Sequence, residues 1–264
     1  MFIISSCDSH FDPLKENERY AFSMYGTLDL HADTQWVRVM PIGEKLIPDD
    51  PEPTDVQVTL TRVSNGESIV MNDSLFRFGG DGYVWNYWVS SSLHPNEQYT
   101  VTAEEPERGQ SGSVVTMPSV LPVPEVEYSI DTEGGTVSGS FTDSLIVLET
   151  RYWVQFGPSC AQQKQIIVSH LEQINDRSGG DFHFSFDNRI PLRTGAGVAG
   201  YMVKERMFFM ITASKDWPYL ANLNDEEVTL PDAVSNVENG TGLITGIAQR
   251  IIEITPRQPC IDVR

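Results

Sequence analysis

The most reactive group of side chains in the sequence lies between residues 181 and 187. Asp181, His183, Ser185 and Asp187 alternate with three phenylalanines, so a strand here places the four polar side chains on one face. An imidazole flanked by carboxylates could hold a metal ion or act as a general base. Strict alternation is also typical of a half-solvated strand with a buried aromatic face. We favour this structural interpretation and keep His183 as a weak ligand-site candidate.

A run of aromatic residues between residues 83 and 88 could instead bind a ligand by stacking. In a strand, Tyr83, Trp85 and Tyr87 share one face and Trp88 lies on the other. Such a platform suits a sugar or a peptide, whereas large residues on both faces also suit a buried strand of a sandwich. Because aromatic side chains dominate protein cores, we favour the core, with Trp85 and Trp88 as weak ligand-site candidates.

Cys7 offers a different chemistry, that of a lipid anchor. The stretch Ile4-Ser5-Ser6-Cys7 resembles a bacterial lipobox, in which a signal peptidase cuts before the cysteine and the thiol is then acylated. A signal peptide needs a basic region and about 7–15 apolar residues, so we expect the natural start to lie upstream of residue 1. The alternative is a chance cysteine in a frayed terminus.

Cys160 and Cys260 remain once Cys7 is acylated, and an exported protein folds where thiols tend to pair. We therefore predict a disulfide between them, which would tie the carboxy-terminal segment to the second domain. The alternative is that both are small buried hydrophobes.

Motifs for metal, cofactor or nucleophilic chemistry are missing from the sequence. It contains no C-x-x-C, H-x-x-x-H, H-E-x-x-H, G-x-S-x-G or P-loop pattern. A G-x-G-x-x-G spacing at residues 195–200 precedes a predicted strand, whereas a dinucleotide fingerprint must follow one and open a helix. We expect no catalytic residues, no metal and no cofactor.

The composition predicts a folded protein that does not bind nucleic acid. The chain has 264 residues, 40% of them apolar and 21% charged, with a formal net charge of −19. This apolar content excludes wholesale disorder, and the negative surface repels phosphate backbones. No run approaches the roughly 20 apolar residues of a membrane-spanning helix.

The elements that must position these residues are predicted to be strands. After a lipobox remnant and tether at residues 1–18, short alternating segments and turn signals predict an immunoglobulin-like or fibronectin-III-like β-sandwich over residues 19–118. Leu93, Pro95 and Tyr99 match the L-x-P-x-x-x-Y pattern of a tyrosine corner, in which the tyrosine hydroxyl bonds to the nearby backbone.

A proline-rich junction near residue 118 predicts a domain boundary, because proline favours extended connections and lacks the backbone donor of a sheet. Residues 119–264 then predict a second β-sandwich-like domain. Within it, Ile166, Ile167, Leu171 and Ile174 follow a helical spacing, so we expect an inserted helix near residues 161–174. The predicted fold class is all-β, with two sandwiches.

The carboxy-terminal motif carries a family resemblance. Asn236, Asn239, Gly240 and Gly242 stand in the pattern N-V-E-N-G-T-G-L-I-T-G, which resembles the domain-of-unknown-function family 4249 of bacterial envelope lipoproteins. Physically, Asn239-Gly240 and Gly242 are expected at turns that demand positive φ. The family has no assigned activity, so the resemblance transfers no catalytic residue.

The resemblance implies a lipoprotein anchored in the outer membrane, either periplasmic or surface-exposed, that works beside a TonB-dependent transporter. We expect a non-catalytic protein that binds a ligand or this transporter partner and is held to the membrane by its lipid anchor. One alternative is a hydrolase of glycan or peptide, which needs paired carboxylates or a His–carboxylate site. A second is a structural or adhesive module, and the fold alone does not choose among the three.

Overall fold

The computed structural model describes residues 20–42, 55–78, 82–129, 134–156, 162–187, 201–214, 217 and 235–255. Nearly all regular structure in these residues is β, which confirms the predicted all-β class. The strands are β1 (Phe22–Asp29), β2 (Thr34–Pro41), β3 (Gln57–Arg62), β4 (Ser68–Val70), β5 (Asn72–Phe78), β6 (Gly82–Ser90), β7 (Gln98–Glu105), β8 (Gly109–Thr116), β9 (Glu125–Ser129), β10 (Gly134–Phe141), β11 (Ser144–Phe156), β12 (Gln162–Ser169), β13 (Gly180–Asp187), β14 (Tyr201–Ala213) and β15 (Gly240–Thr255).

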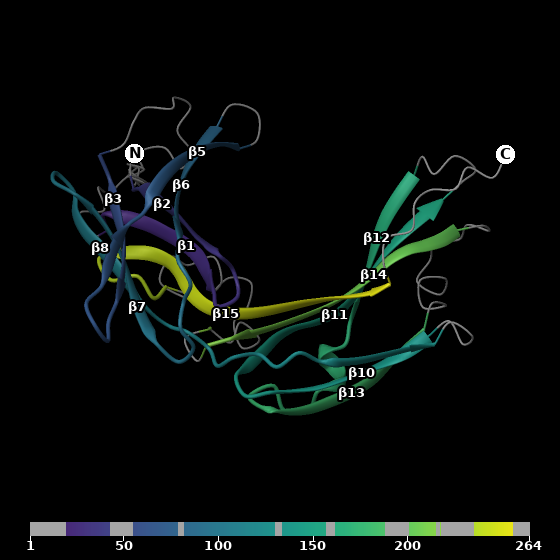
Figure 1. Ribbon diagram of the computed structural model, residues 1–264. Coiled ribbons are helices and arrows are strands. Elements are labelled where there is room, and N and C mark those ends of the chain that lie inside the picture. Colours follow the sequence, from purple (N-terminus) through teal and green to yellow (C-terminus); the bar gives the residue numbers. More distant parts are fainter. Residues whose placement is uncertain are drawn as a thin grey trace, which may run out of the picture.

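One long sheet runs through both lobes of the molecule, in the strand order β12-β11-β14-β15-β1-β2-β6-β5 (Figure 1). Its neighbouring strands are antiparallel except for β15 and β1, which pair in parallel. The sheet is continuous because of β15, whose residues 240–247 pair with β1 and whose residues 247–255 pair with β14.

The first lobe is a sandwich of the β15-β1-β2-β6-β5 part of this sheet and a four-stranded sheet of order β4-β3-β7-β8 (Figure 1). Strand β2 alternates between buried and outward-facing side chains, with Val37 and Val39 each only 1% exposed. They belong to the same core cluster as Val58 and Val101 of the opposite sheet. The period-two pattern therefore fixes which face of each sheet is buried.

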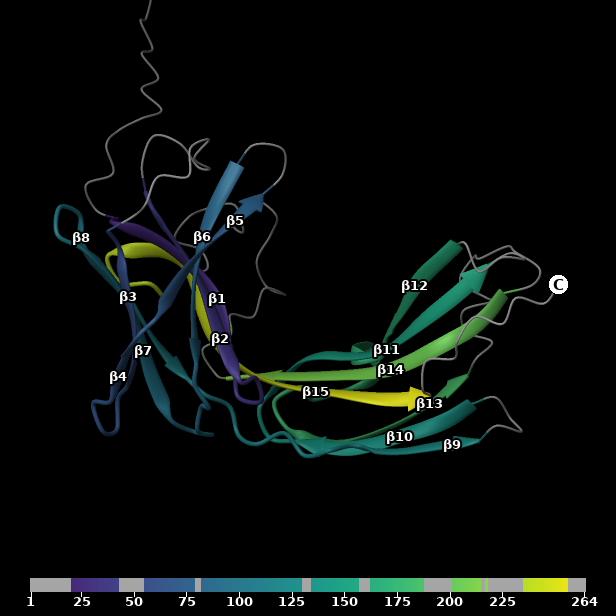
Figure 2. The same cartoon turned by 45° about the horizontal axis from the view of Figure 1, so that its top comes forward.

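The second lobe packs the β12-β11-β14-β15 part of the long sheet on a three-stranded sheet of order β13-β10-β9 (Figure 2). Its core is aromatic. The ring centroids of Phe182 and Phe184 on β13 lie 6.2 and 5.7 Å from that of Phe208 on β14. Aromatic pairs at such distances add to the burial energy of each ring.

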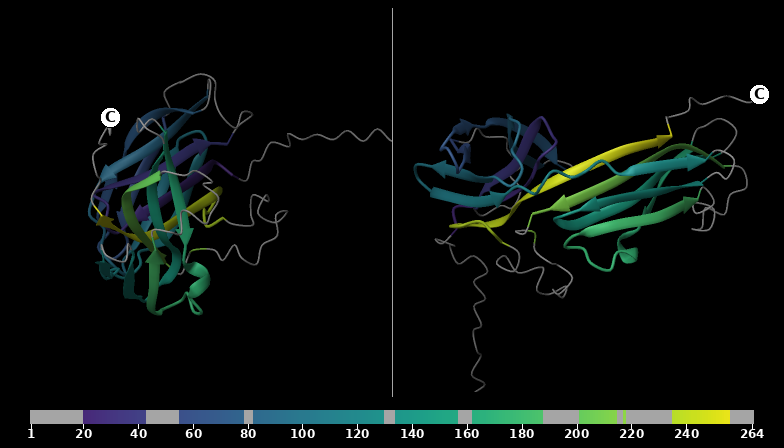
Figure 3. Two further views of the ribbon diagram at one scale, coloured as in Figure 1. Left: turned by 90° about the vertical axis from the view of Figure 1, so that its right-hand side faces the viewer. Right: turned by 60° about the horizontal axis from the view of Figure 1, so that its bottom comes forward.

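The two lobes are joined by β15 and by the proline-rich segment at residues 117–124 (Figure 3). Met117 and Leu121 of this segment are buried, and the Leu121 carbonyl accepts a hydrogen bond of 2.9 Å from Arg250 Nε on β15. A side chain at Gly246 would collide with the backbone of Thr116 and Met117. One hydrophobic cluster consequently extends across the junction.

The helix predicted near residues 161–174 is wrong. Residues 162–169 form strand β12, which pairs antiparallel with β11, and only the single 3-10 turn η1 (Leu171–Gln173) follows. The run Ile166-Ile167-Val168 is β-branched, which favours a strand, and the burial alternates: Ile166 is 9% exposed and Ile167 is 51% exposed. The helical spacing of the apolar residues was coincidental.

The predicted boundary near residue 118 also needs a correction. The proline-rich segment does lead into the second lobe, but residues 240–247 return to the first lobe and complete its sheet beside β1. A parallel pairing between strands so distant in sequence has no local signature. Within the described part of the chain, no helix is long and apolar enough to cross a membrane.

Candidate functional site

Three aromatic side chains gather on the outer face of the long sheet in the first lobe. We call Trp36 of β2, Phe76 of β5 and Trp88 of β6 the aromatic platform. Trp36 is 42% exposed, Phe76 is 46% exposed and Trp88 is half-buried. The Trp36 ring lies 5.8 Å from Phe76 at 73° and 6.0 Å from Trp88 at 32°, measured between ring centroids.

The platform is a consequence of strand alternation and register. Gln35 and Val37 point into the lobe, so Trp36 between them points outward. Trp36 and Trp88 are direct cross-strand partners in the β2–β6 pairing. Side chains of such partners stand about 4.5–5.5 Å apart at Cβ, which brings the two indoles into contact.

Polar side chains lie beside the aromatic rings. In the neighbouring row of the same face, Tyr25 pairs with Arg38, Arg38 with Asn86, and Asn86 with Ser74. Ser74 Oγ accepts a hydrogen bond of 3.1 Å from Trp88 Nε1, which holds that indole in place. Tyr25 is 51% exposed. The surface thus offers apolar ring faces, hydroxyls, an amide and a guanidinium side by side.

The chemistry of this surface is that of binding. Its two rows consist of Tyr25, Arg38, Asn86 and Ser74 in one and Thr27, Trp36, Trp88 and Asn72 in the other, with Phe76 next to Ser74 along β5. None of these side chains is a carboxylate or an imidazole, so they lack a group for acid–base catalysis at neutral pH. Exposed aromatic patches of this kind mark ligand or partner contacts.

The structure separates the two tryptophans that the sequence suggested. Trp88 joins the platform, whereas Trp85 is half-buried and packs against the core cluster of the first lobe. Of the aromatic run, Tyr87 belongs to the core cluster and Trp85 packs against it, so the core interpretation fits these two residues and not Trp88. Sequence reasoning missed Trp36 and Phe76, which come from other strands and reach Trp88 only through the sheet register.

His183 lies on the exposed face of β13, opposite Ser138 in the β10–β13 pairing. Phe182, Phe184 and Phe186 are 4%, 4% and 2% exposed, as the half-solvated strand predicts. Among the described residues, no three His, Cys, Asp or Glu side chains come close enough to hold a metal ion. The predicted alternation of buried phenylalanines and exposed polar residues in this segment is confirmed, and His183 stays a candidate.

A different histidine, His170, is deeply buried. Its Nε2 lies 2.9 Å from Thr150 Oγ1, and Gln173 Nε2 lies 3.3 Å from its Nδ1. The ring stacks on Phe184 with a centroid distance of 4.0 Å. Burial lowers the pKa of His170 to about 4, so the imidazole is neutral at physiological pH. We assign it a structural role in the second lobe.

The tyrosine-corner residues occupy a corner of the first lobe. Tyr99 Oη accepts a hydrogen bond of 3.0 Å from the backbone N–H of His94, the contact that such a motif requires. Leu93 and the Tyr99 ring are buried beside it. A pocket of about 140 Å³ opens next to this corner, between the ends of the two sheets.

The carboxy-terminal motif fastens β15 to the first lobe. Asn236 Nδ2 donates to Ile244 O at 2.6 Å, and Asn236 Oδ1 accepts from Ile244 N at 3.0 Å. Asn239 has φ 52° and Gly242 has φ 119°, as expected, but Gly240 is not in the positive-φ region. Gly240 is needed for space, since a Cβ there would lie 2.6 Å from Phe22 O. The role of the motif is structural.

The lipidation of Cys7 and the pairing of Cys160 with Cys260 stay predictions, because all three cysteines lie outside the described residues. The same holds for the tether that follows Cys7.

Comparisons with known proteins add little to this site. No family model matches the chain, and no curated protein matches its sequence. Among solved structures, a pullulanase from Anoxybacillus sp. LM18-11 aligns with 73% of this chain and 24% of its own, at 10% identity and a TM-score of 0.25. The same pullulanase in complex with maltotriose gives the same values. The chain thus spans about a quarter of that enzyme, and a likeness this distant carries no functional argument.

Proposed function

We propose that this protein is a non-catalytic carbohydrate-binding protein of the bacterial cell envelope, which holds a neutral glycan on the aromatic platform of its first lobe. The observation that carries the proposal is the cluster of exposed Trp36 and Phe76 with half-buried Trp88, in which the Trp36 ring contacts both of the others.

The platform matches the two-sided chemistry of a sugar ring. The C–H groups on one face of a pyranose carry partial positive charge, and they meet the negative face of an aromatic ring favourably. The hydroxyls at the edge of the sugar need hydrogen-bond partners, which the Asn86 amide and the Arg38 guanidinium can provide beside the rings. Apolar area and polar groups placed together in this way supply affinity and orientation, respectively.

A neutral ligand also agrees with the charge of the chain. The net charge of −19 repels phosphorylated or strongly anionic ligands at long range. The nine residues of the platform and its neighbours contain one charged side chain, that of Arg38. Binding through stacking and neutral hydrogen bonds depends little on ionic strength.

The envelope location belongs to the same proposal and is supported by the sequence. The lipobox-like residues ending at Cys7 suggest a lipid anchor, and the carboxy-terminal motif resembles that of envelope lipoproteins. In this arrangement the protein presents a glycan to a TonB-dependent transporter. Metabolic labelling with an alkyne fatty acid should mark the expressed protein, and Cys7→Ser should abolish the label. Pull-down from envelopes should recover a β-barrel transporter, and its absence would contradict that association.

We do not extend the proposal to hydrolysis of the glycan or a peptide, because the platform has no carboxylate or imidazole to act as an acid or base. A purely structural or adhesive module remains the other alternative, and it predicts no saturable binding of soluble glycans.

The proposal is tested by affinity electrophoresis of the full chain through gels that contain neutral glucans, mannans or xylans. At least one polysaccharide should retard the protein. Trp36→Ala should weaken that retardation by about tenfold, since roughly 1.5 kcal/mol of stacking and burial is lost. The matched control is Trp153→Ala, which removes a 36% exposed tryptophan from the second lobe and should change nothing.

Two results would contradict the proposal. One is the absence of retardation by every glycan. The other is an equal effect of Trp36→Ala and Trp153→Ala, which would make the retardation non-specific. Capture of a protein partner that depends on Trp36, without any glycan binding, would show that the platform is a protein interface.

A further inference from the structure

The pocket beside the tyrosine corner has an apolar floor and a polar mouth. Leu60 of β3 is 2% exposed and Tyr99 of β7 is 4% exposed, and together with half-buried Ile69 of β4 they form the floor. Its volume is about 140 Å³. A single water needs only about 10–15 Å³ of such space, so the pocket can accept a small organic molecule.

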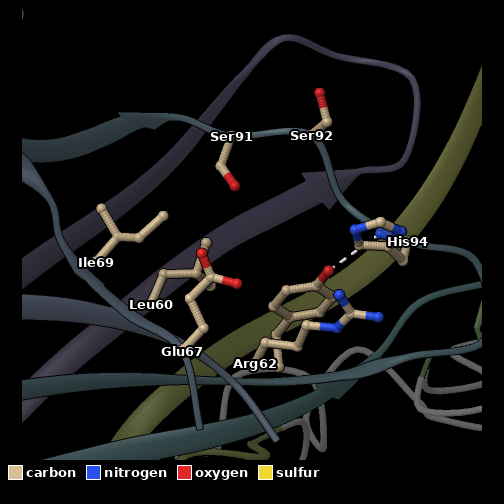
Figure 4. A pocket seen from close by; sticks show the side chains of 8 residues that line it. Leu60, Arg62, Glu67, Ile69, Ser91, Ser92 and His94 are labelled. Atoms are coloured by element: carbon tan, nitrogen blue, oxygen red, sulfur yellow. Dashed lines mark hydrogen bonds between the residues drawn. The ribbon is translucent and has the colours of Figure 1, made fainter. Parts of the chain in front are cut away.

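One side of the mouth carries acceptors for a positive group. Figure 4 shows the Glu67 carboxylate and the Ser91 hydroxyl directed toward each other over the pocket, whereas the Ser92 hydroxyl points away. Asn65 Nδ2 donates to one Glu67 oxygen at 3.3 Å, and the other oxygen accepts no hydrogen bond from the residues that the structure describes. An ammonium group between Glu67 and Ser91 would find two oxygen acceptors there.

The other side of the mouth carries a guanidinium. Arg62 uses Nε and Nη2 to bind Glu97, at 3.5 Å and 3.2 Å, respectively. Among the described residues, Arg62 Nη1 has no hydrogen-bond partner, so it can donate to a carboxylate in the pocket. The His94 side chain lies beside Arg62 at the same end (Figure 4).

Arg62 and Glu67 lie close to each other but form no direct ion pair. Arg62 N donates to Glu67 O at 2.8 Å, so the two residues face each other across the β3–β4 hairpin. Their side chains nevertheless form no ion pair within 4.0 Å of each other. A ligand that carries an ammonium and a carboxylate close together could bind Glu67 with the first group and Arg62 with the second.

We propose that this pocket binds a small zwitterion of the α-amino acid class, with its ammonium on Glu67 and Ser91 and its carboxylate on Arg62. An aliphatic side chain of the ligand would rest on Leu60 and Ile69. The site lies apart from the aromatic platform, and its ligand differs in chemical class from the glycan proposed above.

Isothermal titration of the full chain with L-leucine tests the proposal, with leucinamide and N-acetyl-L-leucine as blocked probes. Leucine should bind, and each blocked probe should bind at least about tenfold more weakly because it lacks one of the two charges. Glu67→Gln should weaken leucine by about the same factor. The matched control Glu107→Gln makes the same change at an exposed turn outside the pocket and should leave the affinity unchanged.

Three results would overturn the proposal: no heat with leucine at millimolar concentration, equal affinity for leucine and leucinamide, or equal effects of Glu67→Gln and Glu107→Gln. Circular dichroism checks that the exposed Glu67 variant is folded. Trp36→Ala should leave leucine binding intact, so that failure of the glycan proposal and failure of this one are separately visible.

Discussion

The two lobes share one sheet, yet the outer face of that sheet differs between them. In the first lobe, Trp36 contacts both Phe76 and Trp88, and Trp36 and Phe76 are exposed to solvent. In the second lobe, the guanidinium of Arg151 lies 3.8 Å above the ring of Phe209 and is held there by Glu149 at 3.0 Å. The Phe209 ring of the second lobe is thus covered by a charged pair, whereas the Trp36 and Phe76 rings of the first lobe are open to a ligand.

The other exposed apolar residues of the second lobe form no aromatic cluster: Trp153 on β11 is 36% exposed but pairs with no other described ring. Ile167 is 51% exposed on β12 and Ile251 is 50% exposed on β15, with β11 and β14 between these two strands. Single exposed aliphatic residues are normal on protein surfaces, whereas a contiguous aromatic group needs a reason. The two lobes share the same sheet, so any difference in binding between them depends on the side chains of its outer face.

The largest expected effect breaks the link between the lobes. Gly242 has φ 119°, and a Cβ there would collide with the backbone of Met24, so Gly242→Val should cost more than about 3 kcal/mol of unfolding free energy. Hydrogen exchange should show β1 and β2 losing protection while β10 and β13 keep theirs.

The control for this change is Gly179→Ala, since a Cβ at Gly179 meets nothing closer than 3.6 Å. If Gly242→Val lowered hydrogen-exchange protection equally in both lobes, the two halves of β15 would not act separately, one in each lobe.

The next largest effect is a pH dependence of stability that arises from His170 in the second lobe. His170 has a folded pKa of about 4 against about 6.5 when unfolded, so the unfolded chain binds more protons between these values. Stability is unaffected above pH 6.5 and falls as the pH drops toward 4, by roughly 2–2.5 kcal/mol at pH 4.5. Urea unfolding at pH 7 and at pH 4.5 measures this loss of unfolding free energy. In His170→Gln, the loss between the two pH values should be smaller by roughly 2–2.5 kcal/mol. An unchanged pH dependence in the variant would refute the assignment.

The smallest effect tests the covered aromatic surface. Arg151→Ala removes both the cation–π contact with Phe209 and the ion pair with Glu149, and it should cost about 1 kcal/mol of unfolding free energy. It should not create glycan binding in the second lobe, because no other described aromatic ring packs against Phe209 as Trp88 packs against Trp36. Thermal melts and the affinity gels measure the two quantities, and gained retardation would show that exposure of any aromatic ring suffices.

Local patterns predicted much of the fold, and pairings distant in sequence explain what they missed. The alternating phenylalanines of β13 identified its buried face correctly, because a strand determines its two faces by itself. The helix expected near residues 161–174 failed, because apolar spacing over one short segment fits both a helix and a β-branched strand.

The platform was predicted only in part, for the same reason. Trp88 was a candidate, but its partners Trp36 and Phe76 belong to strands whose register no local pattern gives. The split role of β15 and the burial of His170 also depend on tertiary contacts. Local sequence patterns therefore predict which face of a strand is buried and where turns occur. They do not predict which strands pair or which sheet faces pack together.

The measurement that tests the central claim most directly is the NMR spectrum of the tryptophan indole N–H groups during titration with the retarding oligosaccharide. The chain has five tryptophans, each assignable by substitution. The account predicts that the signals of Trp36 and Trp88 shift with saturation, while those of Trp85 in the core and Trp153 on the second lobe stay in place. Saturable shifts confined to Trp153, or none at Trp36 and Trp88 while the glycan binds, would contradict it.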